Sequence, residues 1–242
     1  MTSASTVPWT DYDAILFDLD GVVTPTAEVH MRAWAEMFNV FLQEYVGPGD
    51  SAPYDDSDYF AHVDGKPRYD GVRDFLTSRG IPAPQDLVVE LGDRKNDAFN
   101  EVLERDGVEA YPGSVALLDH LRDLGLPLAV VSSSVNAPAV LAAAGLADRF
   151  RTVVSGAVAT ELGLPGKPAP DTFLHAAAEL GATAATSVVL EDAVSGVRAG
   201  AAGDFVLVVG VDRGVGPEAL TEAGATIVVT DLAQLVPTSE TA

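Results

Sequence analysis

The stretch AILFDLDGVVT, residues 14–24, decides how the rest of the chain is interpreted. Its apolar run, 14–17, is long enough for a buried strand and too short for a helix. Asp18 and Asp20 follow, and side chains two residues apart in an extended chain share one face. Two adjacent carboxylates repel each other unless a divalent cation or a proton relieves the charge. For such a pair taken alone, a polar turn after a strand is the more common explanation, so the downstream segments have to decide between the two.

The composition limits the size of the fold and the kind of partner. With 242 residues, of which 48% are hydrophobic, the chain can bury one large core, or a core and a smaller domain. A net charge of −22 argues against partners such as nucleic acid or an anionic membrane, which require a basic surface. The absence of cysteine excludes disulfides and thiol chemistry, as is typical of a cytoplasmic protein.

The sequence indicates neither a signal peptide in residues 1–12 nor a membrane-spanning segment. Residues 1–12 lack the basic and apolar regions of a signal peptide. The chain contains no run of about 18 apolar residues, the length needed to cross a bilayer. We therefore expect a cytoplasmic protein without a membrane partner, and we expect it to be a monomer.

Residues 27–106 have a helical pattern. Apolar residues recur at helical spacing over 27–43, and further helices are expected over 71–78 and 84–105. The intervening stretch, 47–58, is rich in Gly, Pro, Ser and Asp and is expected to be a loop. These segments predict an all-helical unit, residues 27–106, inserted after the first strand.

From residue 111 onward, strands and helices are expected to alternate. The expected strands are 126–131, 152–155, 187–190, 205–210 and 226–229, and the expected helices are 112–124, 136–144, 171–180 and the segment that ends near 202. Such alternation predicts an α/β fold, a Rossmann-like doubly wound parallel sheet with helices on both faces. The core domain would then comprise residues 1–26 and 107–242.

Polar residues follow several of the expected strands. Asp18 and Asp20 follow the first strand, Ser132 follows the second, and Glu191 and Asp192 follow a later one. Ligands of parallel sheets bind beyond the carboxyl ends of the strands, so these groups are expected to meet in one crevice. Helix capping would explain any one of them, but it does not explain the whole set.

A lysine in the segment GKPAPDTF, residues 166–173, belongs to the same set. Only three of the 14 basic residues are lysines, namely Lys66, Lys95 and Lys167. In a chain that otherwise uses arginine, a lysine offers a compact point charge that a guanidinium cannot replace. Lys167 is therefore a candidate for neutralising an anion in the crevice.

Four motifs in this order resemble the haloacid dehalogenase superfamily of phosphotransferases. They are FDLDGVVT (17–24), VVSSSVN (130–136), GKPAPDTF (166–173) and LEDAVSGVRAG (190–200). The helical segment adds TAEVHMRAW (26–34), DGKPR (64–68) and DRKNDAF (93–99). With these, the chain is most similar to the beta-phosphoglucomutase subfamily, in which a helical cap follows the first strand.

The resemblance implies a phosphoryl-transfer enzyme with an Mg²⁺ cofactor. Asp18 would be the nucleophile, and Asp20 the general acid and base for a sugar hydroxyl. Asp18, Asp192 and the backbone carbonyl of Asp20 would hold Mg²⁺, and Glu191 would support the metal site. Oxygen ligands of this kind suit Mg²⁺, and an aspartyl phosphate divides one transfer into two easier steps.

The resemblance also implies residues that bind a small phosphorylated sugar as substrate. For the transferring phosphoryl group these are Ser132, Ser133 and Lys167. For the sugar and its second phosphate they are Thr26 (near the cap hinge), His30, Gly65, Arg68, Lys95, Asn96, Ser134 and Asn136.

Two departures from the subfamily leave two activities open. Val135 stands where its mutases usually carry a basic residue, and Pro25 replaces a common aspartate near the cap hinge. One activity is isomerisation of beta-glucose 1-phosphate to glucose 6-phosphate, which the cap motifs favour. The alternative, which Val135 favours, is a sugar-phosphate phosphatase that transfers the phosphoryl group to water. A dehalogenase is disfavoured because it needs neither the second aspartate nor Mg²⁺, and a binding module because the catalytic set is intact.

Overall fold

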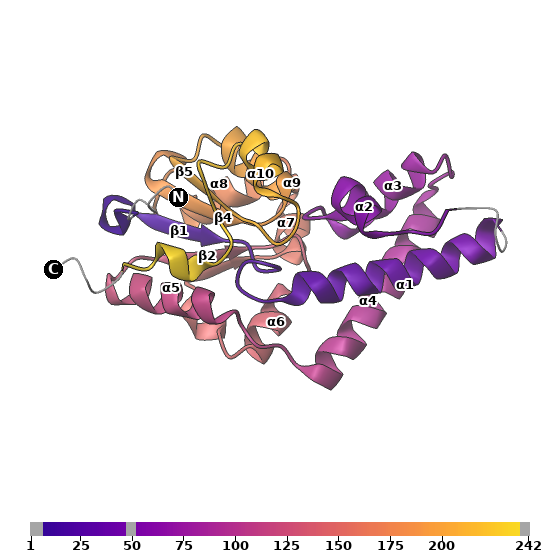
Figure 1. The fold of residues 1–242 in the computed structure, drawn as a ribbon, viewed down its shortest axis with the longest axis horizontal. Coiled ribbons are helices and arrows are strands. Elements are labelled where there is room, and N and C mark those ends of the chain that lie inside the picture. Colours follow the sequence, from indigo (N-terminus) through magenta and orange to yellow (C-terminus); the bar gives the residue numbers. More distant parts are fainter. Residues whose placement is uncertain (1–6, 47–51, 238–242) are drawn as a thin grey trace.

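The computed structural model describes residues 7–46 and 52–237, and its centre is a parallel sheet (Figure 1). The strands are β1 (Ala14–Phe17), β2 (Leu128–Val131), β3 (Thr152–Val154), β4 (Ser187–Glu191), β5 (Leu207–Val211) and β6 (Ile227–Val229). They pair in the order β3-β2-β1-β4-β5-β6, and every pair is parallel. The predicted doubly wound α/β fold is confirmed, and its strand order reverses direction between β1 and β4.

Each face of the sheet packs against its own helices. In β1, Ile15 and Phe17 belong to one hydrophobic cluster, which includes side chains of α5 (Pro112–Asp123) and α6 (Ala137–Ala143). The alternating residues Ala14 and Leu16 belong to a second cluster. This cluster includes side chains of α8 (Asp171–Glu179), α9 (Val194–Ala202) and α10 (Pro217–Ala223). Because both faces of the strand are buried, all four of its residues are apolar.

The sheet-containing part has two short helices that were not predicted from the sequence. α7 (Gly156–Leu162) starts where the Ser155 hydroxyl accepts a hydrogen bond from the Val158 amide, and α10 starts with a proline. Both are seven residues long, which is too short for a clear helical period. Short 3₁₀ segments lie at Trp9–Asp11, Ala147–Arg149, Ala184–Thr186 and Leu232–Leu235.

The regular elements described between β1 and α5 are all helices. They are α1 (Thr26–Val46), α2 (Asp56–Asp58), the π-helix η2 (Tyr59–Val63), α3 (Arg68–Ser78) and α4 (Gln85–Asp106). These helices share a separate hydrophobic cluster, in which Phe38, Phe75 and Leu91 are fully buried. Figure 1 shows α1 and α4 extending away from the sheet, with α2 and α3 beside them.

The expectation of a loop over 47–58 is partly wrong. Residues 47–51 lie outside the described part of the chain, but Asp56–Asp58 form a helical turn. The Asp55 side chain caps this turn by accepting hydrogen bonds from the amides of Ser57 and Asp58. An acidic, serine-containing stretch resembles a loop in composition, although the same residue types favour helix N-termini.

Three backbone carbonyls of the turn after β1 accept hydrogen bonds from later segments of the chain. Arg213 Nε donates to the Gly21 carbonyl (2.7 Å), and its guanidinium lies 3.9 Å from the centroid of the Tyr111 ring. The Ser114 hydroxyl donates to the Val22 carbonyl (2.6 Å), and the Tyr111 amide donates to the Val23 carbonyl (3.0 Å). Three successive carbonyls therefore have fixed partners in the later part of the chain, so the loop that carries Asp20 is rigid.

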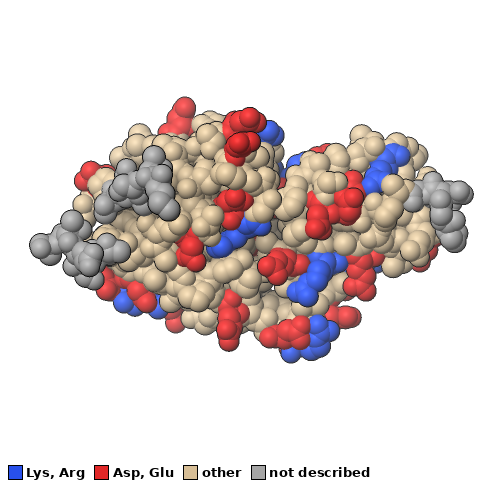
Figure 2. Space-filling view, in the orientation of Figure 1, with Lys and Arg blue, Asp and Glu red and all other residues tan. Residues whose placement is uncertain are grey.

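The surface is predominantly acidic, as the composition requires. Figure 2 shows acidic side chains over both the sheet-containing part and the helical segment, and no continuous basic area on this face. In the described part of the chain, none of the helices is both long enough and apolar enough to cross a bilayer.

Candidate active site

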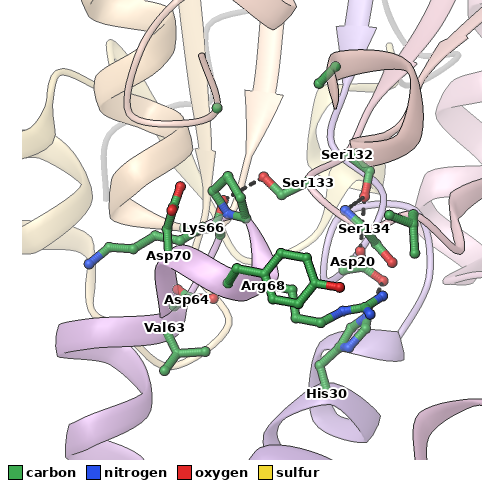
Figure 3. Close-up of a pocket in the computed structure, with 18 of the residues that line it drawn as sticks. Asp20, His30, Val63, Asp64, Lys66, Arg68, Asp70, Ser132, Ser133 and Ser134 are labelled. Atoms are coloured by element: carbon green, nitrogen blue, oxygen red, sulfur yellow. Dashed lines mark hydrogen bonds and ion pairs between the residues drawn. The ribbon is translucent and has the colours of Figure 1, made fainter. Parts of the chain in front are cut away.

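A cavity of about 430 Å³ lies beyond the carboxyl ends of β1 and β4, where sheet and helical segment meet (Figure 3). Most of the predicted site residues line it: Asp18, Asp20, His30, Gly65, Arg68, Lys95, Asn96, Ser132, Ser133, Ser134, Asn136, Glu191 and Asp192. Thr26 and Lys167 do not line it, but both contact residues that do. The structure therefore brings the sequence-predicted set together.

Lys167 lies beneath the cavity and joins two of its carboxylates. Its ammonium group, on a residue only 3% exposed, contacts Asp18 Oδ1 and donates to Glu191 Oε1 (2.7 Å) and to the Val131 carbonyl (3.0 Å). Burial lowers the pKa of Lys167, but Asp18 and Glu191 more than compensate and raise it above its usual value. Lys167 is therefore a permanent cation that touches the proposed nucleophile.

Asp18 and Asp192 are buried beside other carboxyl groups, and this environment disfavours their ionised forms. Burial, together with Glu191, raises the pKa of both carboxyls well above the usual range, although Lys167 opposes the shift. Asp192 also lies tightly against Gly21, because a Cβ there would be only 1.8 Å from its Oδ2. The glycine, with φ of +89°, is required for this close approach.

Asp20 is held as an ionised carboxylate by its neighbours. Thr26 Oγ1 donates to its Oδ1, and Ser132 Oγ donates to its Oδ2 (3.2 Å). His30 Nε2 lies 3.3 Å from Oδ1, without the alignment of a hydrogen bond. Burial alone would raise the pKa of Asp20, but His30, Thr26 and Lys95 together lower it to about 2. At neutral pH this carboxylate is free to accept a proton.

His30 and Lys95 form a buried pair behind Asp20. Lys95 Nζ contacts His30 Nδ1, and the imidazole stacks on Phe99 with ring centroids 4.0 Å apart. Burial lowers the pKa of Lys95 to about 7, and burial with the neighbouring Lys95 also lowers that of His30. With Nδ1 contacting the lysine, Nε2 is the ring nitrogen that faces Asp20.

Arg68, Asn96 and Asn136 form a polar group farther along the cavity. Asn96 Oδ1 accepts hydrogen bonds from Arg68 and from the Asn136 amide, each at 2.8 Å. Arg68 also lies 3.6 Å from Asp93, outside the predicted set. Val135 is 40% exposed and lines the same cavity. The position beside Asn136 therefore offers no charge to a ligand.

The Ser133 side chain contacts the helical segment. Its hydroxyl donates to the Gly65 carbonyl (2.8 Å), and so it joins the loop after β2 to the loop before α3 (Figure 3). Ser195, which was not predicted, donates in the same way to the Asp64 carbonyl (2.9 Å). The motif DGKPR is thus docked on the sheet-containing part, and Asp64 enters the cavity lining.

Sequence reasoning missed Asp64, Ser195 and Arg213. Asp64 had a signal, because it opens the quoted motif DGKPR directly before a glycine. Ser195 likewise lies within a quoted motif, LEDAVSGVRAG, but its bond to a carbonyl in the helical segment could not be foreseen. Arg213 had no signal, since it contacts a backbone carbonyl more than a hundred residues away in the chain.

Comparisons with known proteins match most of the chain to haloacid dehalogenase-like proteins. A family model for a haloacid dehalogenase-like hydrolase matches residues 12–204. The chain is 47% identical, over 239 residues, to a beta-phosphoglucomutase of Mycobacterium tuberculosis (strain CDC 1551 / Oshkosh), covering 92% of this chain and 91% of that protein. It is 31% identical, over 201 residues, to hexitol phosphatase A of Escherichia coli (strain K12), covering 80% and 81%. The solved structure of a Clostridium difficile beta-phosphoglucomutase is similar with a TM-score of 0.77 and 25% identity, covering 93% of both chains.

Proposed function

We propose a function on the basis that this chain belongs to the haloacid dehalogenase-like hydrolase family and is an enzyme of that type. The enzyme transfers the phosphoryl group of a small phosphorylated sugar to and from the side chain of Asp18. One observation carries the proposal: Asp18 touches the buried cation Lys167, in the same cavity as an ionised Asp20.

Asp18 acts first, as the nucleophile. Its carboxylate oxygen forms a bond to phosphorus while the bond from phosphorus to the sugar oxygen breaks, which leaves an aspartyl phosphate. Lys167 stabilises the negative charge on the transferring group, since it keeps its proton throughout. Phosphoryl transfer depends mainly on such positioning and charge stabilisation.

Asp20 moves the proton in each direction. As a carboxylate it accepts the proton of the sugar hydroxyl that attacks the aspartyl phosphate, and as an acid it returns a proton to the departing sugar oxygen. Thr26, Ser132 and His30 hold it in place for both steps. The rigid turn that follows Asp20 fixes its backbone in the same way.

The donor set fits Mg²⁺, because all of its members are oxygens. Among the described residues, no three side chains of His, Cys, Asp or Glu form a cluster that would enclose a metal by themselves. Two carboxylates, Asp18 and Asp192, with the Asp20 carbonyl, nevertheless offer the few hard oxygens that Mg²⁺ uses when it retains its waters. Their raised pKa values indicate negative charge that a divalent cation would balance. When bound, Mg²⁺ would supply further positive charge to the transferring phosphoryl oxygens.

Glu191 has a supporting role at this metal site. Its carboxylate accepts hydrogen bonds from Lys167 (2.7 Å) and from the Ala193 amide (2.7 Å). Both oxygens are therefore engaged in positioning the lysine and the chain around Asp192. This supports the expected role, in which Glu191 orients the metal ligands.

We assign the reaction as isomerisation of beta-glucose 1-phosphate to glucose 6-phosphate through a bound bisphosphate. The 47% identity to a beta-phosphoglucomutase supports this assignment, and so does the polar group around Arg68. Residues 27–106 would serve as a cap domain, docked on the core through the loop before α3. Such a cap excludes water, so that a sugar hydroxyl is the acceptor.

A phosphatase is the second candidate, and Val135 favours it. The exposed valine gives the second phosphate of a bisphosphate no positive charge beside Asn136. The likeness to hexitol phosphatase A is compatible with this reading. Incubation with beta-glucose 1-phosphate, Mg²⁺ and catalytic glucose 1,6-bisphosphate separates the two candidates. Glucose 6-phosphate without inorganic phosphate indicates the mutase, free phosphate indicates the phosphatase, and neither product would contradict the proposed chemistry.

Exchange of Asp20 for asparagine tests the proton-transfer role. We expect Asp20→Asn to lower kcat on the order of 10² to 10⁴-fold, the usual contribution of general acid–base catalysis. The amide keeps the shape of the side chain but cannot take up a proton. Steady-state rates with beta-glucose 1-phosphate provide the measurement, and a loss below threefold would reject the role.

Arg68 and Val135 together test whether the site binds a second phosphate. Arg68→Ala is expected to reduce kcat/KM for glucose 1,6-bisphosphate at least tenfold more than for phenyl phosphate, because the fork of a guanidinium suits phosphate. Val135→Lys is expected to act in the opposite direction and to raise the ratio of isomerisation to hydrolysis. If Arg68→Ala affects both substrates equally and Val135→Lys affects neither, the enzyme is the phosphatase.

A further inference from the structure

Asp64 is a cavity-lining carboxyl to which the proposed mechanism gives no task. It lies between the π-helix η2 and α3, in the loop that Figure 3 shows beside Ser133 and Arg68. Its neighbours in the cavity include Asp18, Asp20 and Tyr59. Among the described residues, no Lys, Arg or His side chain lies within ion-pair distance of it.

The backbone around Asp64 is fixed against the opposite wall of the site. The Ser195 and Ser133 hydroxyls donate to the carbonyls of Asp64 and Gly65, at 2.9 and 2.8 Å. Gly65 itself packs so closely that a Cβ would be 2.3 Å from Ser195 Oγ, and its φ is +68°. The backbone at Asp64 is therefore held by docking of the helical segment, and this places the residue in the wall of the cavity.

Charge limits what this carboxyl can bind. Burial, and then the charge of Glu191, raise the pKa of Asp64 to about 7, while the Tyr59 hydroxyl opposes the shift as a hydrogen-bond partner. A phosphoryl oxygen is anionic and would be repelled by the ionised form of this carboxyl. A neutral hydroxyl group, in contrast, donates a hydrogen bond to a carboxyl oxygen.

We propose that Asp64 is a specificity-determining residue that accepts a hydrogen bond from a ring hydroxyl of the sugar phosphate. The inference rests on the proposed function, since it names the part of the substrate that the helical segment recognises. A site built to bond a hydroxyl rejects an analogue that lacks it, because the buried polar group is then left unpaired. The enzyme would thus select polyhydroxylated phosphate esters over simple ones.

The test compares a sugar ester with an ester that has no hydroxyl. We expect Asp64→Ala to lower kcat/KM for beta-glucose 1-phosphate about 10- to 100-fold, the cost of losing a hydrogen bond to a charged group. The rate with phenyl phosphate should change less than threefold. Asp64→Asn should recover part of the loss, because its amide oxygen still accepts. Asp86→Ala, which removes an exposed carboxylate of the same helical segment, is the matched control and should match wild type.

A deoxy-sugar series identifies the hydroxyl. The 2-, 3- and 4-deoxy analogues of beta-glucose 1-phosphate are each assayed with wild type and with Asp64→Ala. With wild type, one analogue should have a much lower kcat/KM than the parent sugar. With Asp64→Ala, the same analogue and the parent sugar should have similar kcat/KM values, which is the non-additivity expected of a direct contact.

Three results would overturn the inference. The first is an equal loss of kcat/KM with both esters in Asp64→Ala, and the second is additive losses throughout the deoxy series. The third is a raised Mg²⁺ requirement in Asp64→Ala. Each would assign Asp64 to another task. The proposed function fails separately, if wild type turns over neither ester.

Discussion

Asp18→Asn is expected to abolish turnover, on the order of 10⁴-fold or more, while leaving the fold intact. An amide cannot form the aspartyl phosphate, so the loss should appear with every phosphate ester. Asp18 is 6% exposed as a residue and lies close to Glu191, so its conversion to a neutral amide removes repulsion within the acidic group. The free energy of unfolding should therefore be unchanged or higher.

Two measurements separate these effects. Acid quenching with radiolabelled substrate detects the aspartyl phosphate in wild type and should detect none in Asp18→Asn. Urea unfolding monitors the fold, and Asp148→Asn, an exposed carboxylate outside the cavity, controls for the change in charge. A folded Asp18→Asn protein with rates within tenfold of wild type would falsify the nucleophile assignment.

The family and the sheet were predictable because their signals are local. β1 has the predicted bounds, since a four-residue apolar run followed by two aspartates leaves little freedom. The helices α1, α4 and α8 lie within three residues of prediction at each end, because their apolar stripes extend over several turns. The resemblance, which rested on motifs in order, is confirmed.

Some helix ends and side-chain partners were not predictable, because they depend on local chain direction or on contacts between distant segments. α3 begins at Arg68, three residues before the expected Gly71, because Pro67 sets the chain direction at its start. The hydrogen bond from the Ser133 hydroxyl to the Gly65 carbonyl, which joins the helical segment to the loop after β2, was not predicted. Sequence indicates that a serine is present at a strand end, but the partner depends on how the helical segment docks.

Lys167→Arg is the second substitution with a large expected effect, although it conserves the charge. The ammonium group makes three contacts in a closed space, to Asp18, Glu191 and the Val131 carbonyl, and lies 5.0 Å from the centroid of the Phe173 ring. A guanidinium is planar and larger, so it cannot satisfy these three acceptors from the same position. We expect kcat to fall on the order of 10² to 10³-fold, as when a well-placed electrostatic donor is lost.

The alternative is that Lys167 serves only stability. Lys167→Met measures the contribution to stability. It leaves two buried carboxylates without a cation, which typically lowers the free energy of unfolding by about 3–5 kcal/mol. If the role is purely structural, Lys167→Arg should unfold in urea like wild type and also turn over like wild type. Lys66→Arg is the matched control, since its ammonium bonds Asp74 (2.6 Å) and none of the catalytic carboxylates. A stable Lys167→Arg protein with strongly reduced kcat would show that catalysis requires the compact ammonium group, because charge and stability would both have been retained.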